Sequence, residues 1–140
     1  MAAKYCYSYP RPAVTVDIVL LSRNGRVLLI KRKAEPFKGR WALPGGFVNI
    51  DERLADAAAR ELEEETGITG VDLRQLHAFD DPARDPRGRT ISIAFLAKVD
   101  EPRTPTAKSD AADARWTPLD QLPPMAFDHD RVVALALQAQ

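Results

Sequence analysis

Two apolar runs on either side of an Asn-Gly pair constrain the fold of this chain more than any other feature of its sequence. Residues 13–21 and 26–31 are rich in Val, Ile and Leu, a composition typical of buried strands. The pair between them, Asn24-Gly25, is the strongest short-range signal for a β-hairpin turn. The sequence therefore predicts that the domain opens with a β-hairpin.

The rest of the chain alternates structured segments with loops that contain prolines. Residues 51–66 predict a helix with Asp51 as its N-cap and Gly67 after its last turn, and a second helix is expected to begin at Asp128 and end near residue 139. Further strands are predicted at residues 71–79, 90–99 and 114–117, with loops at 31–40, 80–89 and 100–110 and a short apolar segment at 41–46 that ends in a flexible turn. This order favours an α/β (α+β) sandwich with a mixed sheet, in one domain over residues 1–140, rather than a parallel βαβ array.

Composition and charge exclude several classes of protein. The 20 Lys and Arg residues balance 20 Asp and Glu residues, which argues against a broad basic surface and so against a nucleic-acid partner. No apolar run approaches the roughly 20 residues that span a bilayer, and the N-terminus does not resemble a signal peptide, so no membrane partner is expected. The single cysteine, Cys6, cannot form an internal disulfide, which favours a cytoplasmic location.

Three glutamates on the first predicted helix point to chemistry. Glu61, Glu64 and Glu65 lie at i, i+3 and i+4, so their side chains are neighbours and repel one another. A hard divalent cation such as Mg²⁺, which prefers carboxylate oxygens, would remove that repulsion. Arg60 stands four residues before Glu64 and can orient its carboxylate. A glutamate run on its own is more often a solvated helix face. The choice between that interpretation and a metal site therefore depends on the joint pattern with neighbouring residues.

That joint pattern resembles a complete Nudix box over residues 46–68. Its fixed positions are filled by Gly46, Glu52, Arg60, Glu61, Glu64, Glu65 and Gly67, and its aliphatic positions by Leu62 and Ile68. The resemblance implies a Nudix-type α/β/α sandwich over nearly the whole chain. It also implies a hydrolase that cuts the diphosphate linkage of a small-molecule nucleotide with the help of Mg²⁺, or of Mn²⁺ in its place.

The resemblance also implies which residues carry the chemistry. The metal ligands are expected to be Glu61, Glu64, Glu65 and Gly46, and the catalytic residues Glu52, Arg60, Glu61 and Glu64. Glu61 acts as a metal ligand or as the general base, and both roles stay open. Glu52 and Arg60 are expected to pair and hold the geometry. The general base can also lie on a loop outside the box, and the acidic residues of 80–85 are candidates.

Three short segments outside the box resemble the ADP-ribose pyrophosphatase branch of the family. They are Tyr9-Pro10-Arg11-Pro12, residues 85–89 and residues 126–129. The substrate-binding residues expected from them and from the glycine turn are Gly45, Gly46, Arg84, Arg87, Arg89, Phe127 and His129. Each has a structural alternative: the arginines form a solvated loop, Phe127, Phe37 and Tyr9 are buried aromatics rather than platforms for adenine, and His129 is a surface residue of the last helix. Trp41 and Trp116 are expected in the core.

The leading hypothesis is hydrolysis of ADP-ribose to AMP and ribose 5-phosphate. A second is release of pyrophosphate from an oxidised dGTP, because the basic loop at 31–40 is compatible with a triphosphate. A third, from another class, is a nucleotide-sugar-sensing module without catalysis; the complete set of box carboxylates, and a chain that ends directly after its last predicted helix, argue against it. A homodimer is expected, with the aromatic N-terminal arm as a plausible interface element.

Overall fold

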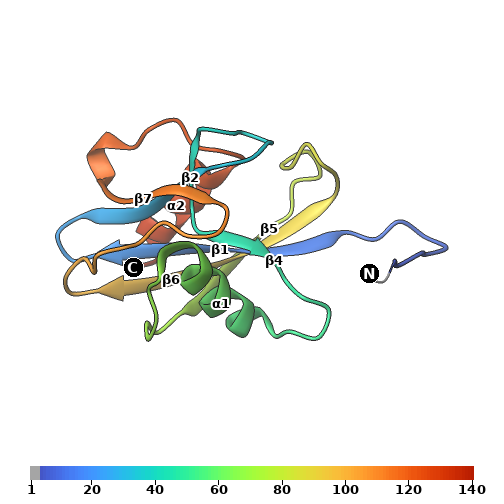
Figure 1. Ribbon diagram of the computed structural model, residues 1–140, viewed down its shortest axis with the longest axis horizontal. Coiled ribbons are helices and arrows are strands. Elements are labelled where there is room, and N and C mark those ends of the chain that lie inside the picture. The colour runs from blue at the N-terminus through green and yellow to red at the C-terminus, as the bar shows by residue number, and fades with distance from the viewer. Residues whose placement is uncertain (1–3) are drawn as a thin grey trace.

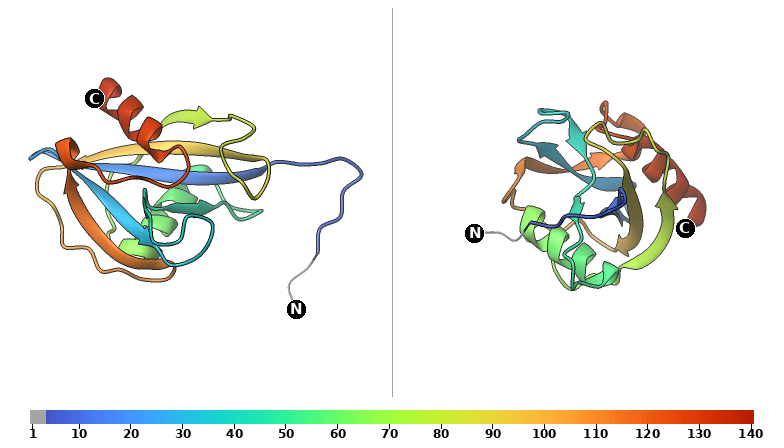
Figure 2. Two further views of the ribbon diagram at one scale, coloured as in Figure 1. Left: turned by 90° about the horizontal axis from the view of Figure 1, so that it is seen from above. Right: turned by 90° about the vertical axis from the view of Figure 1, so that its right-hand side faces the viewer.

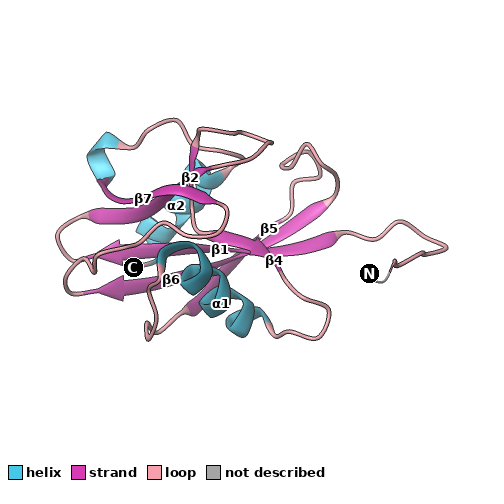
Figure 3. Cartoon of the chain, viewed as in Figure 1, coloured by secondary structure: helices cyan, strands magenta, loops and turns pink. Residues whose placement is uncertain are grey.

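The computed structural model describes residues 4–140 and consists of one sheet with a helix on each face (Figure 1). The elements in chain order are β1 (Ala13–Ser22), β2 (Arg26–Arg32), β3 (Trp41–Ala42), β4 (Gly45–Phe47), α1 (Leu54–Thr66), β5 (Arg74–Phe79), β6 (Thr90–Val99), β7 (Ala111–Pro118), the 3₁₀ turn η1 (Leu119–Gln121) and α2 (His129–Ala139). Figure 3 separates these helices and strands by colour. No helix in the described part of the chain is long and apolar enough to cross a bilayer.

The predicted hairpin and mixed sheet are both present. β1 and β2 pair antiparallel around the Asn24-Gly25 turn, with Leu21 opposite Val27, and Gly25 adopts the positive φ of 81° that favours glycine. β1 also pairs with β6 along its whole length, and this pairing is parallel. The sheet has the order β3-β2-β1-β6-β5, with β4 paired to β1 and β7 paired to β2. β1 is therefore a central strand, buried on both faces.

The two helices cover opposite faces of the sheet, as the left view of Figure 2 shows. On one face α1 packs Ala57, Ala58 and Leu62 against alternate residues of β1 such as Ile18 and Leu20. On the other face α2 contributes Val132, Val133 and Ala136 to a cluster with the intervening residues Val19 and Leu21. Because successive side chains of a strand point to opposite faces, β1 serves both layers. Trp41 and Trp116 are partly buried and pack at the edges of these two clusters.

One boundary of α1 differs from the sequence prediction. α1 begins at Leu54 with Arg53 as its N-cap, so the prediction of a cap at Asp51 was wrong. Residues 49–52 instead form a turn in which the Glu52 N–H donates to the carbonyl of Asn49 at 3.1 Å. At the other end the prediction is confirmed: Gly67 has φ of 74° and donates its N–H to the carbonyl of Glu63.

The segment predicted to end in a flexible turn is instead strand β4. Gly46 lies opposite Val16 and Gly45 opposite Asp17 in the antiparallel pairing with β1. An added Cβ at Gly45 would lie 2.1 Å from the backbone oxygen of Val16, so only glycine allows the two strands to come this close. The prediction missed this strand because the close approach is a contact between segments far apart in the sequence.

We expect Gly45→Ala to destabilise the fold by more than about 3 kcal/mol, because the methyl group meets backbone that cannot move aside. Gly39→Ala is the matched control: Gly39 has φ of 83° but open space around it, so strain alone should cost about 1 kcal/mol. Urea unfolding followed by circular dichroism measures both. Equal losses of stability for the two variants would contradict the close approach of β4 to β1.

Candidate functional site

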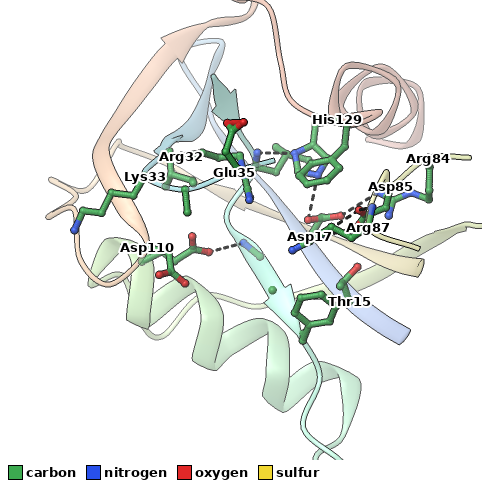
Figure 4. Close-up of a pocket in the computed structure, with 18 residues that line it drawn as sticks. Thr15, Asp17, Arg32, Lys33, Glu35, Arg84, Asp85, Arg87, Asp110 and His129 are labelled. Carbon is green, nitrogen blue, oxygen red and sulfur yellow. Dashed lines mark hydrogen bonds and ion pairs between the residues drawn. The ribbon is translucent and has the colours of Figure 1, made fainter. Parts of the chain in front are cut away.

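A cavity of about 230 Å³ opens between the C-terminal part of α1, β4 and the start of α2 (Figure 4). Its walls come from segments spread over the whole chain: β1, β2, the loop after β2, β4, α1, the loop before β6, the loop before β7 and the start of α2. The lining side chains are mostly charged or aromatic, and they include both carboxylates and guanidinium groups. They include Asp17, Arg32, Lys33, Gly45, Gly46, Phe47, Glu65, Arg84, Asp85, Arg87, Asp110, Phe127 and His129.

Glu65 is the buried carboxylate of the cavity. Its side chain turns from α1 toward β4, where its Oε1 accepts the N–H of Gly45 at 2.7 Å, and the residue is 5% exposed. Burial raises the pKa of Glu65 to about 8, and the nearby carboxylates of Glu61, Asp17 and Asp110 add to this rise. The site thus holds a carboxyl group that readily gives up its proton only when a positive charge comes close.

Arg60 organises the other box carboxylates. Its Nε and Nη2 donate to the two oxygens of Glu52 at 2.7 and 2.8 Å, and its Nη1 donates to Glu61 at 2.8 Å and Glu64 at 3.2 Å. Nη2 also donates to the carbonyl of Phe47, which ties α1 to β4. These hydrogen bonds hold the pKa of Glu52 below its usual value and raise that of Arg60. The expected pairing of Arg60 with Glu52 is thus present.

Gly46 brings backbone against the Glu61 carboxylate. An added Cβ at this position would lie 2.6 Å from both carboxylate oxygens of Glu61, so the Glu61 carboxylate would have to move away from its present place. Burial raises the pKa of Glu61, although the hydrogen bond from Arg60 opposes the rise. The approach leaves the Gly46 backbone and Glu61 side by side, both with oxygen atoms that a cation can use.

The glutamates on the acidic side have oxygen atoms that a hard divalent cation prefers, although in this structure these carboxylates are hydrogen-bonded to other residues. Glu61 and Glu64 accept from Arg60, Glu65 accepts from Gly45, and across residues 4–140 no three Asp, Glu, His or Cys side chains gather closely enough to hold a metal. The donor set is nevertheless oxygen only, which suits Mg²⁺ or Mn²⁺. The buried Glu65 carboxyl, with its raised pKa, is a group that a cation would stabilise in its charged form.

Arginine and aromatic side chains form the opposite side. Arg87 donates to Asp85 through Nε and Nη2, and its guanidinium lies 5.0 Å from the ring centre of Phe47 and 5.5 Å from that of Phe127. Burial alone would raise the pKa of Asp85, but the hydrogen bonds from Arg87 outweigh it and the pKa is lowered. Arg32 lies on Phe127, 5.0 Å from its ring centre. Guanidinium groups next to flat rings suit an anion attached to a planar base.

Most of the predicted substrate-binding residues line this cavity, and one does not. Those in the lining are Gly45, Gly46, Arg84, Arg87, Phe127 and His129. Arg89 is outside it, exposed, with its guanidinium donating to the carbonyl of Asp80. Among the acidic candidates at 80–85, Asp85 lines the cavity. Of the aromatic candidates, Phe127 lines the cavity, Phe37 contacts its ring edge-on, and Tyr9 is 79% exposed on the N-terminal arm.

The surface position considered for His129 was wrong. The residue is 4% exposed, its Nδ1 accepts the N–H of Leu43 at 3.0 Å, and its Nε2 lies 3.3 Å from Asp17. The helical pattern alone could not place it, because the first turn of α2 faces the cavity rather than solvent.

Sequence reasoning missed Asp17 and Asp110, and it considered Arg32 only as part of the basic loop at 31–40. Asp17 left a usable signal, since it is a charged residue within a strand that is otherwise apolar. Asp110 left none: it reaches the cavity because its carbonyl accepts the N–H of Lys33 and because the N–H of Lys108 donates to the carbonyl of Glu65. Those contacts join segments that the sequence gives no reason to pair.

Comparison with known protein families identifies the domain. Residues 11–136 match the NUDIX domain, so the match includes the box, α1, all strands of the sheet and α2 up to residue 136. The chain belongs to the Nudix family. The predicted Nudix fold is confirmed. Of the box residues expected at the site, Gly46 and Glu65 line the cavity, whereas Glu52, Arg60, Glu61 and Glu64 lie outside its lining.

Individual Nudix relatives add detail. The chain is 43% identical over 125 residues to an ADP-ribose pyrophosphatase of Methanocaldococcus jannaschii, covering 89% of this chain and 73% of that protein. It is 35% identical to an ADPR responsive transcriptional repressor, NtrR, of Acinetobacter baylyi, covering 86% of this chain but 51% of the repressor. The NUDIX domain of Shewanella oneidensis NrtR, solved with ADP ribose, superposes with a TM-score of 0.88 at 30% identity, covering 94% and 90% of the two chains. Family membership and the first of these relatives make the protein a Nudix pyrophosphohydrolase.

The raised pKa of Glu65 gives a stability that depends on pH. Folded Glu65 has a pKa of about 8 against an ordinary 4.5, so its contribution is fully present below pH 4.5 and is lost as pH rises through 8. Glu65→Gln keeps an acceptor for Gly45 and has no proton to lose. Without metal, we expect Glu65→Gln and the natural protein to be equally stable near pH 4.5. At pH 9 the variant should be the more stable of the two by roughly 2–4 kcal/mol.

Urea unfolding with EDTA at several pH values measures this difference. A difference independent of pH would show that Glu65 is not the titrating group. Excess Mg²⁺ at pH 9 should stabilise the natural protein and leave Glu65→Gln unchanged, because a bound cation favours the charged carboxylate.

Proposed function

We propose that the protein hydrolyses ADP-ribose to AMP and ribose 5-phosphate in a reaction that depends on Mg²⁺. The observation that carries the proposal is that one cavity is lined both by the buried carboxyl of Glu65 and by the guanidinium groups of Arg32 and Arg87. Carboxylates suit the cation and guanidinium groups suit the diphosphate. The 43% identity to an ADP-ribose pyrophosphatase supports the same substrate.

The metal in this proposal is held by Glu61, Glu64 and Glu65, with the backbone at Gly46 beside them. When bound, Mg²⁺ would neutralise charge on the diphosphate and lower the pKa of a bound water molecule. The distance of Arg60 from Glu61 and Glu64, 2.8 and 3.2 Å, supports a role in holding these carboxylates in place. Because Arg60 carries one positive charge among three carboxylates, the cluster keeps a net negative charge for a cation.

The binding side of the cavity positions the substrate. Arg32 and Arg87 supply positive charge for the diphosphate, and both lie near the ring of Phe127, which offers a flat surface for the base. During hydrolysis the oxygen of water bonds to one phosphorus, the bond from that phosphorus to the bridging oxygen breaks, and the second phosphate leaves. The water proton passes to a carboxylate, for which Glu61 remains a candidate.

We expect AMP and ribose 5-phosphate from ADP-ribose only when Mg²⁺ or Mn²⁺ is present, measured by chromatography of the products. Glu64→Gln should lower kcat by about a hundredfold, because it removes a charged ligand. Glu63→Gln is the matched control: this glutamate is exposed on the same helix but outside the box positions, so kcat should stay unchanged. Full activity of Glu64→Gln would remove that residue from the mechanism.

Two other functions are separated by the same assay. Oxidised dGTP in the substrate panel tests the triphosphate alternative. If pyrophosphate is released from oxidised dGTP faster than AMP is formed from ADP-ribose, oxidised dGTP is the better substrate and the ADP-ribose proposal is rejected. The 35% identity to a repressor favours a second candidate, a module that binds the nucleotide without cutting it. Tight binding of ADP-ribose in calorimetry, with no AMP formed in either metal, would favour that candidate.

The proposal includes a homodimer in which the N-terminal arm packs against a second copy of the chain. Residues 4–12 run away from the domain (Figures 1 and 2), and Tyr5 and Tyr9 are 62% and 79% exposed. Exposed aromatic side chains gathered on one segment suit an interface. A cytoplasmic location and the absence of a nucleic-acid partner belong to the same proposal, supported by the single Cys6 and the zero net charge.

Deleting residues 1–10 should convert the dimer to a monomer without loss of the fold, because the arm makes no strand of the sheet. Light scattering coupled to size exclusion measures the mass, and circular dichroism checks the fold. A dimer that survives the deletion would place the interface elsewhere.

A further inference from the structure

Asp17 is a carboxylate at a position that the fold otherwise fills with apolar side chains. It lies in the middle of β1, on the same face as Val19 and Leu21, which pack into the core beneath α2. The residue is 6% exposed and lines the cavity, where Figure 4 shows it beneath His129. A buried carboxylate is costly unless its oxygens are hydrogen-bonded or paired, so its partners explain why it is there.

Three groups from three different segments meet the Asp17 carboxylate. The hydroxyl of Ser92, on the neighbouring strand β6, donates to Oδ2. Nε2 of His129 lies 3.3 Å from Oδ1, and Nη2 of Arg84 lies 3.8 Å from Oδ2. Burial alone would raise the pKa of Asp17, but these partners outweigh it and the pKa is lowered. Asp17 therefore joins the central strand to the start of α2 and to the loop before β6.

The contact with His129 fixes the hydrogen-bonding state of the imidazole. Because Nδ1 accepts the N–H of Leu43, the proton of a neutral ring must lie on Nε2, which then donates to Asp17. Leu43 is two residues before Gly45, whose N–H binds Glu65. The connection from Asp17 thus reaches the acidic side of the cavity.

Arg84 carries the connection to the substrate-binding side. Its Nε and Nη2 donate to the two oxygens of Asp128 at 3.0 and 2.7 Å, and its side chain is 3% exposed. This two-pronged bond ties the loop at 80–89 to the residue before α2. The residues next to the two partners, Asp85 and Phe127, both line the cavity, and Phe127 is held at a positive φ of 52°.

We propose that Asp17 is a positioning residue that holds the loop at 80–89 and residues 127–129 in place for the nucleoside diphosphate, acting through Arg84 and His129. It orients two donors that would otherwise share no acceptor, and those donors belong to the segments that carry Arg87 and Phe127. The inference rests on the proposed function, because it concerns the affinity of the same site for its substrate. It assigns Asp17 a role outside the box, on the binding side of the cavity.

Asp17→Asn keeps the size of the side chain but leaves a single oxygen for Ser92 and His129 and removes the negative charge that faces Arg84. With ADP-ribose we expect KM to rise about tenfold, the effect of leaving one buried donor unpaired, while kcat changes by less than about threefold. Asp128→Asn weakens the same connection from its partly exposed end and should also raise KM. Because both variants act through Arg84, the double variant should raise KM by less than the product of the two single effects.

Asp100→Asn is the matched control, since Asp100 is also paired with an arginine, Arg23 at 2.9 Å, but lies 83% exposed and outside the cavity. It should leave KM and kcat unchanged. A fall of kcat with unchanged KM in Asp17→Asn would overturn the proposal and place Asp17 in the chemical step. Unchanged KM, or effects that multiply in the double variant, would also overturn it.

A measurement without substrate separates this inference from the proposed function. Hydrogen exchange at the amides of Arg84, Arg87 and Gly88, whose N–H groups bond within the loop, should be faster in Asp17→Asn and in Asp128→Asn than in natural protein or Asp100→Asn. Absence of ADP-ribose turnover in the natural protein would reject the proposed function alone. Unchanged exchange in the loop would reject the positioning role, and if Asp17→Asn does not fold, Asp128→Asn decides by the same criteria.

Discussion

The hydrogen bond between Gly45 and the Glu65 carboxylate is the contact on which the site depends. It joins β4, a strand possible only because glycine lets it lie against β1, to the last turn of α1. The backbone carbonyl of Glu65 also accepts the N–H of Lys108, so the loop before β7 is fixed to the same turn. One buried residue thus positions the acidic wall of the cavity from both its side chain and its backbone.

This arrangement is electrostatically unfavourable, because it places carboxylates close to one another. Four carboxylates stand close together on and beside α1, and burial raises the pKa of two of them, Glu61 and Glu65. Arg60 offsets part of that repulsion by donating to three carboxylates at once, but Glu65 is left outside its reach. Buried charge without a full set of partners weakens a fold, so its presence is better explained by a cation that binds there than by stability.

The sequence predicted the parts of the fold that depend on local pattern. The hairpin at Asn24-Gly25, the C-terminus of α1 at Gly67 and the acidic face of that helix follow from spacing within a few residues, and the structure has them all. The predicted helix start at Asp51 was wrong because the Glu52 side chain accepts hydrogen bonds from Arg60 and from the N–H of Asn49 instead. The sequence did not predict strand β4 or the burial of His129, because both depend on contacts with β1, more than twenty residues away.

The cavity also combines residues that follow a local sequence pattern with residues brought together from distant segments. The box contributes Gly46 and Glu65 to the lining from one continuous segment, which a sequence motif captures. Asp110 and the binding wall come from the loop before β7, β1, β2, the loop at 80–89 and the start of α2. An ADP-ribose pyrophosphatase and an ADPR responsive repressor both resemble this chain over 86% or more of its length. Binding a nucleotide requires only the assembled wall, whereas cutting it also requires the acidic one. This chain has both, and Asp17 links them: it lies against Arg84 and His129, and His129 accepts the N–H of Leu43, two residues before the Gly45 that binds Glu65.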